Sequence, residues 1–256
     1  MRLSLFLKSR AVAAALAVLA LSYPAPAQIH DELSMDVTDV SDPDAPIKVS
    51  AGKIAFKQDV FADYVKAACT AHIELTNVSW RTVLAYEVLV RATPHYQGGV
   101  NRTDRNDGFF SANATFVAGS QEVLNYDCSS KTAISNKDGP LTPHRHTEAP
   151  EATFKVLFVE FVDGATYGSS EWGDRLHEGR AATIESMKGL LQAYQRGGEK
   201  SLRSTLAAAL ARSDDPPYAQ DALRILQEKL DSDGINALIT TLEARLKAAE
   251  MHTKMM

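Results

Sequence analysis

The stretch CTAHIELTNVSWRTVLAYEVLV, residues 69–90, decides the fold class. In its first part, Cys69–Leu75, apolar and polar side chains alternate, which is the pattern of a strand with one buried face. Asn77 to Arg81 have the composition of a turn, and Thr82–Val90 is a second run in which only Glu87 interrupts the apolar outer face. The stretch therefore predicts two strands, the second of which needs cover on both faces.

A later segment has the same two-sided apolar character. Phe154–Val162 is apolar on both faces apart from Lys155 and Glu160. Asp163-Gly164 follows as a strong hairpin-turn signal and leads into a short predicted strand at Ala165–Tyr167. A second sheet would cover one face of these strands, and we expect helices to cover the other.

The composition changes near residue 170. Residues 47–170 hold 14 of the 19 aromatic residues, whereas residues 171–256 hold three and contain 13 Ala and 12 Leu. Aromatic residues suit sheets, and Ala and Leu suit helices. This order predicts an α+β protein, with an antiparallel β-sandwich domain over residues 47–170 and a helical segment over residues 171–256.

The helical segment contains four apolar stripes at helical spacing, which predict about four helices. Gly197-Gly198 separates the first two stripes, and residues 231–234 separate the last two. The last stripe is the clearest and consists of Ile235, Leu238, Ile239, Leu242, Leu246 and Ala249. If its apolar face found no room on the sheet, it would become an oligomer contact, so a homo-oligomer formed through the C-terminal helices is one prediction.

The first 27 residues have the parts of an export signal. A basic start is followed by an apolar run over residues 11–21 and by Ala25-Pro26-Ala27, which predicts cleavage between Ala27 and Gln28. The alternative is an uncleaved membrane anchor, but the run is about half the roughly 20 residues that a membrane span needs. We therefore expect a soluble periplasmic or secreted protein without a transmembrane segment.

The segment that follows is strongly acidic. Residues 28–46 are predicted to be a flexible leader, because residues 31–46 contain six acids, no base and two prolines. The whole chain has a formal net charge of −5, and it falls to about −8 without residues 1–27. This sign excludes a protein that coats nucleic acid, whose affinity needs clustered cations.

The chain has two cysteines, Cys69 and Cys128, and both share the inward parity of the apolar residues around them. In an oxidising compartment such a pair favours a disulfide bond. Two buried free thiols or a nucleophilic cysteine are the alternatives.

Cys69, Trp80 and Tyr126-Asp127-Cys128 resemble the Cys…Trp…Tyr-x-Cys pattern of immunoglobulin-like sandwiches. The resemblance implies an Ig-like fold in which the cysteines join the two sheets and Trp80 packs on the bridge. Separately, Phe161–Gly168, together with the turn Asn77-Val78-Ser79, resembles a pattern in uncharacterised secreted bacterial proteins of β-sandwich fold. That second resemblance implies no activity.

The only local histidine pair is His144-Arg145-His146, in a loop flanked by Pro143 and Pro150. With His95 as a third ligand, His144 and His146 are candidate metal ligands, although the sequence favours a solvated loop that happens to contain two histidines. The chain has no G-x-S-x-G, H-E-x-x-H, C-x-x-C, phosphate-loop or dinucleotide motif. We therefore predict no catalytic residue and no cofactor.

Together these features predict an exported, non-catalytic binding or structural module of the bacterial envelope. Its partner would be an envelope protein or a glycan, contacted through two long polar loops, Tyr96–Asp107 and Ser129–Ala149. The alternative is a metal-dependent or hydrolytic enzyme that uses His95, His144 and His146 with nearby carboxylates.

Overall fold

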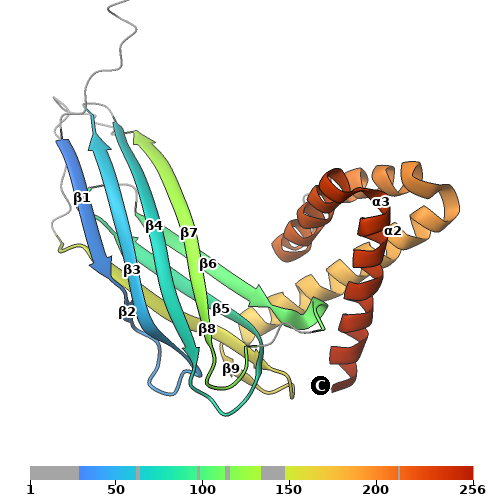
Figure 1. Cartoon of the computed structure of the whole chain (residues 1–256), viewed down its shortest axis with the longest axis horizontal. Coiled ribbons are helices and arrows are strands. Elements are labelled where there is room, and N and C mark those ends of the chain that lie inside the picture. The colour runs from blue at the N-terminus through green and yellow to red at the C-terminus, as the bar shows by residue number, and fades with distance from the viewer. Residues whose placement is uncertain are drawn as a thin grey trace, which may run out of the picture.

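The computed structural model describes residues 29–61, 64–96, 99–112, 116–133, 148–212 and 214–255. A strand-rich N-terminal part and a helical C-terminal part meet at one end and form a V (Figure 1). The strands are β1 (Ile29–Asp36), β2 (Thr38–Asp39), β3 (Ile47–Val60), β4 (Tyr64–Asn77), β5 (Val83–Thr93), β6 (Val100–Asp107), β7 (Gln121–Ala133), β8 (Glu151–Phe161) and β9 (Thr166–Gly168). A 3-10 turn, η1 (Gly108–Phe110), and two helices, α2 (Ser170–Leu210) and α3 (Pro217–Met255), complete the elements.

The strands form two sheets. The first has the order β1-β3-β4-β7 and is antiparallel throughout. The second has the order β2-β8-β5-β6, with β9 also paired to β8, and only the short β2–β8 pair is parallel. The two sheets enclose one apolar core, whose largest fully buried side chains are Ile47, Ile54, Phe56, Ile73, Leu75, Tyr86 and Phe154.

The alternation predicted from the sequence is present in β4. Cys69, Ala71, Ile73 and Leu75 are all buried, while the residues between them face outward. β5 and β8 are buried on both faces over much of their length, as their sequences predict. The hairpin at Asp163-Gly164 is also confirmed, with Gly164 at a φ of 80° and β9 pairing back onto β8.

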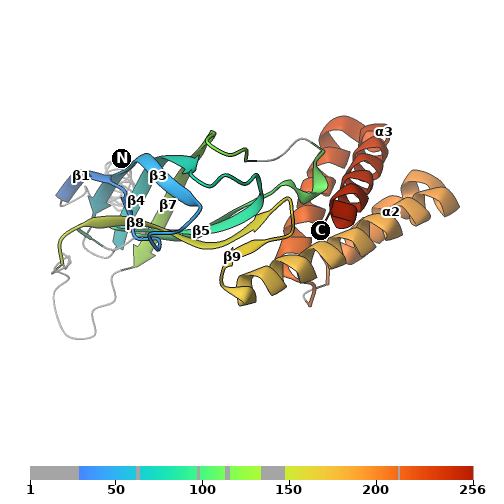
Figure 2. The same ribbon diagram turned by 90° about the horizontal axis from the view of Figure 1, so that it is seen from below.

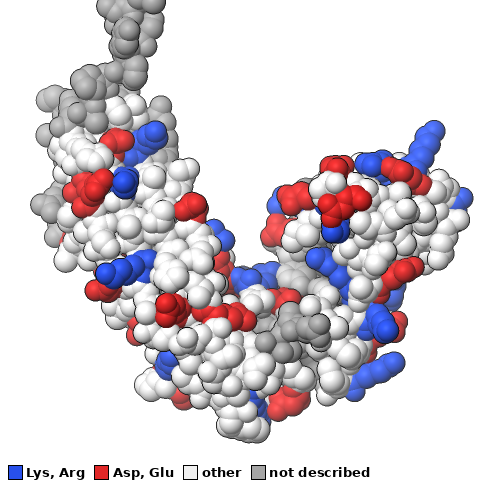
Figure 3. Space-filling view, viewed as in Figure 1, with Lys and Arg blue, Asp and Glu red and all other residues white. Residues whose placement is uncertain are grey.

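The helices cover one end of the outer face of the second sheet and lie to that end of the sandwich (Figure 2). Two small apolar clusters make this contact, one with Leu84, Phe109 and Ala249 and the other with Ala85, Phe158 and Leu176. Gly173 permits the close approach, because a Cβ there would lie 2.9 Å from the ring of Phe158. Beyond this junction, the space-filling view shows an open hollow between the sandwich and the helices (Figure 3).

The helices have an apolar core of their own. Its buried members are Met187, Leu190, Leu202, Leu206, Ala209, Leu223, Leu226, Leu230, Leu238 and Leu242. The apolar stripe of the last helical stretch, on which the homo-oligomer prediction depended, thus packs within the chain.

The prediction of about four helices is wrong, because the helical part consists of two long elements, α2 and α3. The predicted breaks are bends inside these elements. Gly198 has a φ of 63° and Gly234 a φ of 82°, and the helix resumes after each of them. A glycine at positive φ redirects the chain within one or two residues, so no loop separates the stripes.

The Ig-like assignment is also wrong. Cys69 and Cys128 are bonded, but they are direct partners on β4 and β7, which are neighbours in the same sheet. In an Ig-like sandwich the bridge crosses between the sheets. Trp80 does not pack on the disulfide, since it lies in the β4–β5 connection with 81% of its surface exposed.

The acidic segment predicted as a flexible leader, residues 28–46, contains β1 and β2 instead. Leu33 and Met35 pack against the sandwich core. On the outer face, the carboxylate of Glu32 lies 3.4 Å from the Lys57 ammonium of β3. Cross-strand pairs of this kind offset the like charges that make the segment look disordered in isolation.

Much of the predicted polar loop Tyr96–Asp107 is the edge strand β6. Polar side chains connect it to β5: Arg105 of β6 pairs with Glu87, and Arg91 of β5 donates from Nε to Asn101. Of the second predicted loop, Ser129–Ala149, residues 129–133 belong to β7, and residues 134–147 lie outside the described residues.

The predicted export signal and its cleavage position between Ala27 and Gln28 lie outside the described residues. Within the part of the chain that the structure describes, no helix combines the length and apolar character needed to cross a bilayer.

Replacing both cysteines by alanine measures the contribution of the disulfide. The bond joins residues 59 apart in sequence, and closing a loop of that size is worth about 4 kcal/mol in the chain-entropy model. We expect Cys69→Ala/Cys128→Ala to lower the free energy of unfolding by about this amount in urea denaturation followed by circular dichroism. Ser129→Ala, beside Cys128 on the exposed face, is the control, and equal midpoints for the two variants would contradict the prediction.

Candidate functional site

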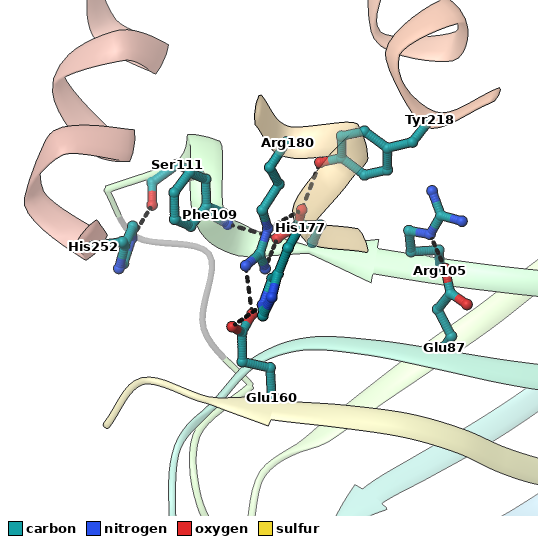
Figure 4. A network of polar contacts seen from close by, with 10 residues as sticks. Glu87, Arg105, Phe109, Ser111, Glu160, His177, Arg180, Tyr218 and His252 are labelled. Atoms are coloured by element: carbon teal, nitrogen blue, oxygen red, sulfur yellow. Dashed lines mark hydrogen bonds and ion pairs between the residues drawn. The ribbon is translucent and has the colours of Figure 1, made fainter. Parts of the chain in front are cut away.

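A chain of buried charged side chains lies where the second sheet, η1 and both helices meet (Figure 4). Arg180 of α2 is at its centre. Its Nε and Nη2 donate to the two carboxylate oxygens of Asp107, at 2.9 and 2.8 Å. Its Nη1 lies 2.5 Å from Oε2 of Glu160 on β8. All three side chains are almost completely buried, so this cluster is a three-way ion pair inside the protein.

Local structure holds Asp107 in place. It ends β6 and caps η1, where its Oδ1 accepts a hydrogen bond of 2.9 Å from the backbone N–H of Phe109. Tyr218, in the first turn of α3, donates its hydroxyl to Oδ2 at 2.5 Å. Gly179 lets α2 and α3 approach, because a Cβ there would lie 2.6 Å from the Cβ of Tyr218. One carboxylate therefore binds groups from α2, η1 and α3.

Two further pairs extend the cluster. His177 places Nε2 at 2.9 Å from Glu160 Oε1, and about half of its side chain, 52%, is exposed. On the neighbouring strand, the fully buried carboxylate of Glu87 pairs with Arg105. The Arg105 guanidinium also lies 4.9 Å from the ring centroid of Tyr218.

Burial and charge shift the ionisation of these groups. Burial raises the pKa of Glu87, and the nearby Arg105 opposes this only in part. Burial also disfavours the charged form of Arg180, but Asp107 and Glu160 outweigh it and raise the pKa of Arg180. Burial and the charge of Asp107 raise the pKa of Tyr218, so its hydroxyl stays protonated and donates.

The ion pairs of this cluster connect the sandwich to the helices. The guanidinium of Arg180 and the carboxylates of Asp107 and Glu160 are buried and paired with one another, whereas His177 and, in part, Arg105 reach solvent. We call these residues, with Glu87, Arg105 and Tyr218, the junction cluster.

A second feature is the exposed tryptophan at one end of the sandwich. Among the exposed large apolar side chains of the described residues, Trp80 has the greatest exposed fraction, 81%. It borders a hollow of about 440 Å³. Trp80 and this hollow are called the Trp80 surface, and the lining residues are Pro43, Asp44, Ala45, Pro46, Val78, Ser79, Trp80, Arg81, Phe161, Thr166 and Tyr167.

Asn77 fixes the turn that carries Trp80. Its side chain is fully buried, and its Nδ2 donates to the backbone carbonyls of Arg81 and Phe116, both at 2.8 Å. Its Oδ1 accepts from the backbone N–H of Ser79 at 3.0 Å and from the Ser79 hydroxyl at 2.7 Å. The turn is thus braced from inside while its tryptophan points into solvent.

Arg81 supports the tryptophan from one side. Its guanidinium carbon lies 4.7 Å from the ring centroid of Trp80 and 5.3 Å from that of Phe161. Its Nε is 3.4 Å from the carboxylate of Asp163. One face of the indole therefore rests against Arg81, and the rest of the ring is open.

The candidate metal ligands do not come together in the described structure. His95 is mostly buried and places Nδ1 at 2.9 Å from Asp31 Oδ2 on β1. His144 and His146 lie outside the described residues, and among the residues described no group of three or more His, Cys, Asp or Glu side chains is arranged to hold a metal ion. Metal binding by these histidines stays a prediction.

Comparisons with known proteins leave the geometry as the basis for interpretation. No family model matches the chain, and no curated protein is significantly similar to it. The two candidate features are therefore weighed on their contacts alone. The charged groups of the junction cluster pair with one another, whereas the Trp80 surface is open to a ligand.

Replacing Arg180 tests whether it holds the junction. Arg180→Leu leaves Asp107 and Glu160 buried without their guanidinium, so we expect the free energy of unfolding to fall by about 3–5 kcal/mol. Arg203→Leu on the same helix is the control, because Arg203 pairs with Glu199 at the surface and such pairs are worth about 1 kcal/mol or less. Similar small losses in urea denaturation of both variants would refute the central role of Arg180.

The raised pKa of Glu87 predicts a pH dependence of stability. The folded state holds this proton more tightly than the unfolded state, so the contribution of Glu87 is fully present below its unfolded pKa and is lost as the pH rises through its folded pKa. Glutamine cannot ionise. We expect the stability of Glu87→Gln relative to the wild type to increase between acidic and neutral pH, measured by urea denaturation at each pH. The exposed Glu243→Gln supplies the background, and an equal trend in both variants would contradict the prediction.

Proposed function

We propose that the protein is a non-catalytic binding module of the bacterial envelope and that the Trp80 surface is its recognition surface. The observation that carries the proposal is a tryptophan with 81% of its surface exposed, held on a turn that the buried Asn77 braces. Tryptophan is enriched among the residues that dominate binding energy. A braced turn also loses little conformational entropy when a ligand binds.

The size of the tryptophan side chain allows its contribution to the free energy of binding to be calculated. A tryptophan can bury about 150–250 Å², and apolar burial is worth about 25 cal/mol per Å². Covering the exposed indole would therefore contribute on the order of 4–6 kcal/mol before the costs of association.

Two features support a location outside the cytoplasm. The Cys69–Cys128 disulfide is typical of oxidising compartments, and the first 27 residues have the pattern of an export signal. A periplasmic or secreted protein is therefore part of the proposal. In such a module, the junction cluster would fix the orientation of the helices relative to the sandwich.

A thermal-shift screen against soluble cell-wall fragments, glycans and purified envelope proteins tests this function. A ligand that binds only the folded state at about 100 times its Kd stabilises it by about 2.7 kcal/mol. We expect at least one ligand to raise the Tm of the wild type and of Val123→Ala, which removes an exposed apolar residue of β7, but not of Trp80→Ala. If every stabilising ligand acts equally on Trp80→Ala, the Trp80 surface is not the recognition surface.

A further inference from the structure

The charges around the Trp80 surface disfavour anionic ligands. Asp42 and Asp44 are exposed, and Asp163 stands beside Arg81. Among the described residues, two cations lie nearby: Arg81, whose Nε is 3.4 Å from the carboxylate of Asp163, and Lys48, which does not line the hollow and whose ammonium donates to the backbone carbonyl of Asp42 at 2.5 Å. Within the residues that the structure describes, a phosphate or carboxylate ligand would therefore meet three carboxylates, those of Asp42, Asp44 and Asp163, against two cations.

The position of Arg81 disfavours a cationic ligand as well. Its guanidinium already occupies one face of the Trp80 ring, with its carbon 4.7 Å from the ring centroid. A second cation on the opposite face would be attracted by the ring quadrupole but repelled by the charge of Arg81 through the ring. The open face of the indole therefore favours a neutral group.

The polar groups of the hollow select a ligand rich in hydrogen-bond donors. An ionised carboxylate such as that of Asp44 only accepts hydrogen bonds. The Tyr167 hydroxyl is already directed to Asp42, at 3.3 Å. A pyranose ring meets both demands, because its hydroxyls donate and its C–H face suits the electron-rich face of an indole. A proline-rich peptide would also stack, but proline has no N–H to donate to Asp44.

The dimensions agree with this chemistry. The hollow of about 440 Å³ falls in the range of about 300–1,000 Å³ found for small-ligand sites. We infer that the Trp80 surface binds a neutral saccharide, with one pyranose ring stacked on the open face of Trp80 and its hydroxyls donating to Asp44. This inference rests on the proposed function and adds the class of ligand.

Tryptophan fluorescence of the full chain tests the inference directly. The chain has two tryptophans, so Trp172→Phe leaves Trp80 as the only indole that reports binding. The probes are neutral linear hexasaccharides of glucose, mannose and N-acetylglucosamine, with hexagalacturonate and decaproline as the anionic and proline-rich alternatives. We expect at least one neutral hexasaccharide to change the Trp80 emission saturably. Calorimetry on the unsubstituted chain gives the same answer if Trp172→Phe folds poorly.

Variants identify the contacts. Trp80→Ala should abolish binding in calorimetry, and Asp44→Asn should weaken it by about tenfold or more, since a hydrogen bond to a charged group is worth about 1.5–3 kcal/mol. Asp36→Asn, an exposed acid on the outer face of the first sheet, should bind as the wild type does.

Each other outcome overturns the inference in a distinguishable way. Binding of decaproline alone, lost in Trp80→Ala, would replace the saccharide by a peptide and leave the recognition surface in place. Binding of hexagalacturonate alone would refute the charge argument. Saccharide binding that survives Trp80→Ala would refute this site for both the inference and the proposed function, and no binding of any neutral hexasaccharide would refute the saccharide class.

Discussion

The three-way ion pair of Arg180 with Asp107 and Glu160 is the interaction on which the arrangement of sandwich and helices depends. In the described residues, two small apolar clusters and the packing of Phe110 against the helical core join the two parts, so the hydrophobic effect alone offers little to fix their orientation. A guanidinium that is bidentate to one carboxylate and in contact with a second has a defined direction. Because its charges are buried, any reorientation would expose unpaired ions to an apolar interior.

The free-energy cost of burying these charges falls mainly on the second sheet. Glu87 and Glu160 are buried acids in strands that are largely apolar on both faces. Helices that covered the sheet with leucine alone would avoid the cost but would slide more freely. Phe110 of η1 packs against the helical core, but the sandwich and the helices each have their own apolar interior, and the junction joins them. The two parts therefore form a V without a large shared core.

The sequence predicts β4, β5, β8 and β9, because alternation, two-sided apolarity and a hairpin-turn signal depend on local sequence. The predictions were wrong where pairing between residues distant in the sequence determines whether a strand forms. β1 and β6 contain too many charges to look like strands, and their partners Lys57 and Glu87 become visible only once the register is known. The predicted number of helices was wrong for a different reason, because composition does not distinguish a glycine bend inside α2 or α3 from a loop between two helices.

The disulfide shows the limit of side-chain parity. Cys69 and Cys128 both point inward, and this holds for a bridge within one sheet as well as for one between sheets, because paired residues on neighbouring strands face the same side. The resemblance to Ig-like sandwiches therefore gave the right bond and the wrong topology. For the junction cluster, the only signal in the sequence was the pair of isolated acids Glu87 and Glu160, and nothing pointed to Arg180 as their partner.

The exposure of Trp80 follows from the topology rather than from the local sequence. β4 belongs to the first sheet and β5 to the second, so the turn between them crosses from one layer to the other at the end of the sandwich. A side chain there lies beyond both sheets, and in the described residues Arg81 is the group that stacks on it. The same crossing buries Asn77, which must satisfy the backbone groups of Arg81 and Phe116. One connection therefore produces both the rigid support and the open indole, and this coupling is the reason to assign the tryptophan a role in recognition.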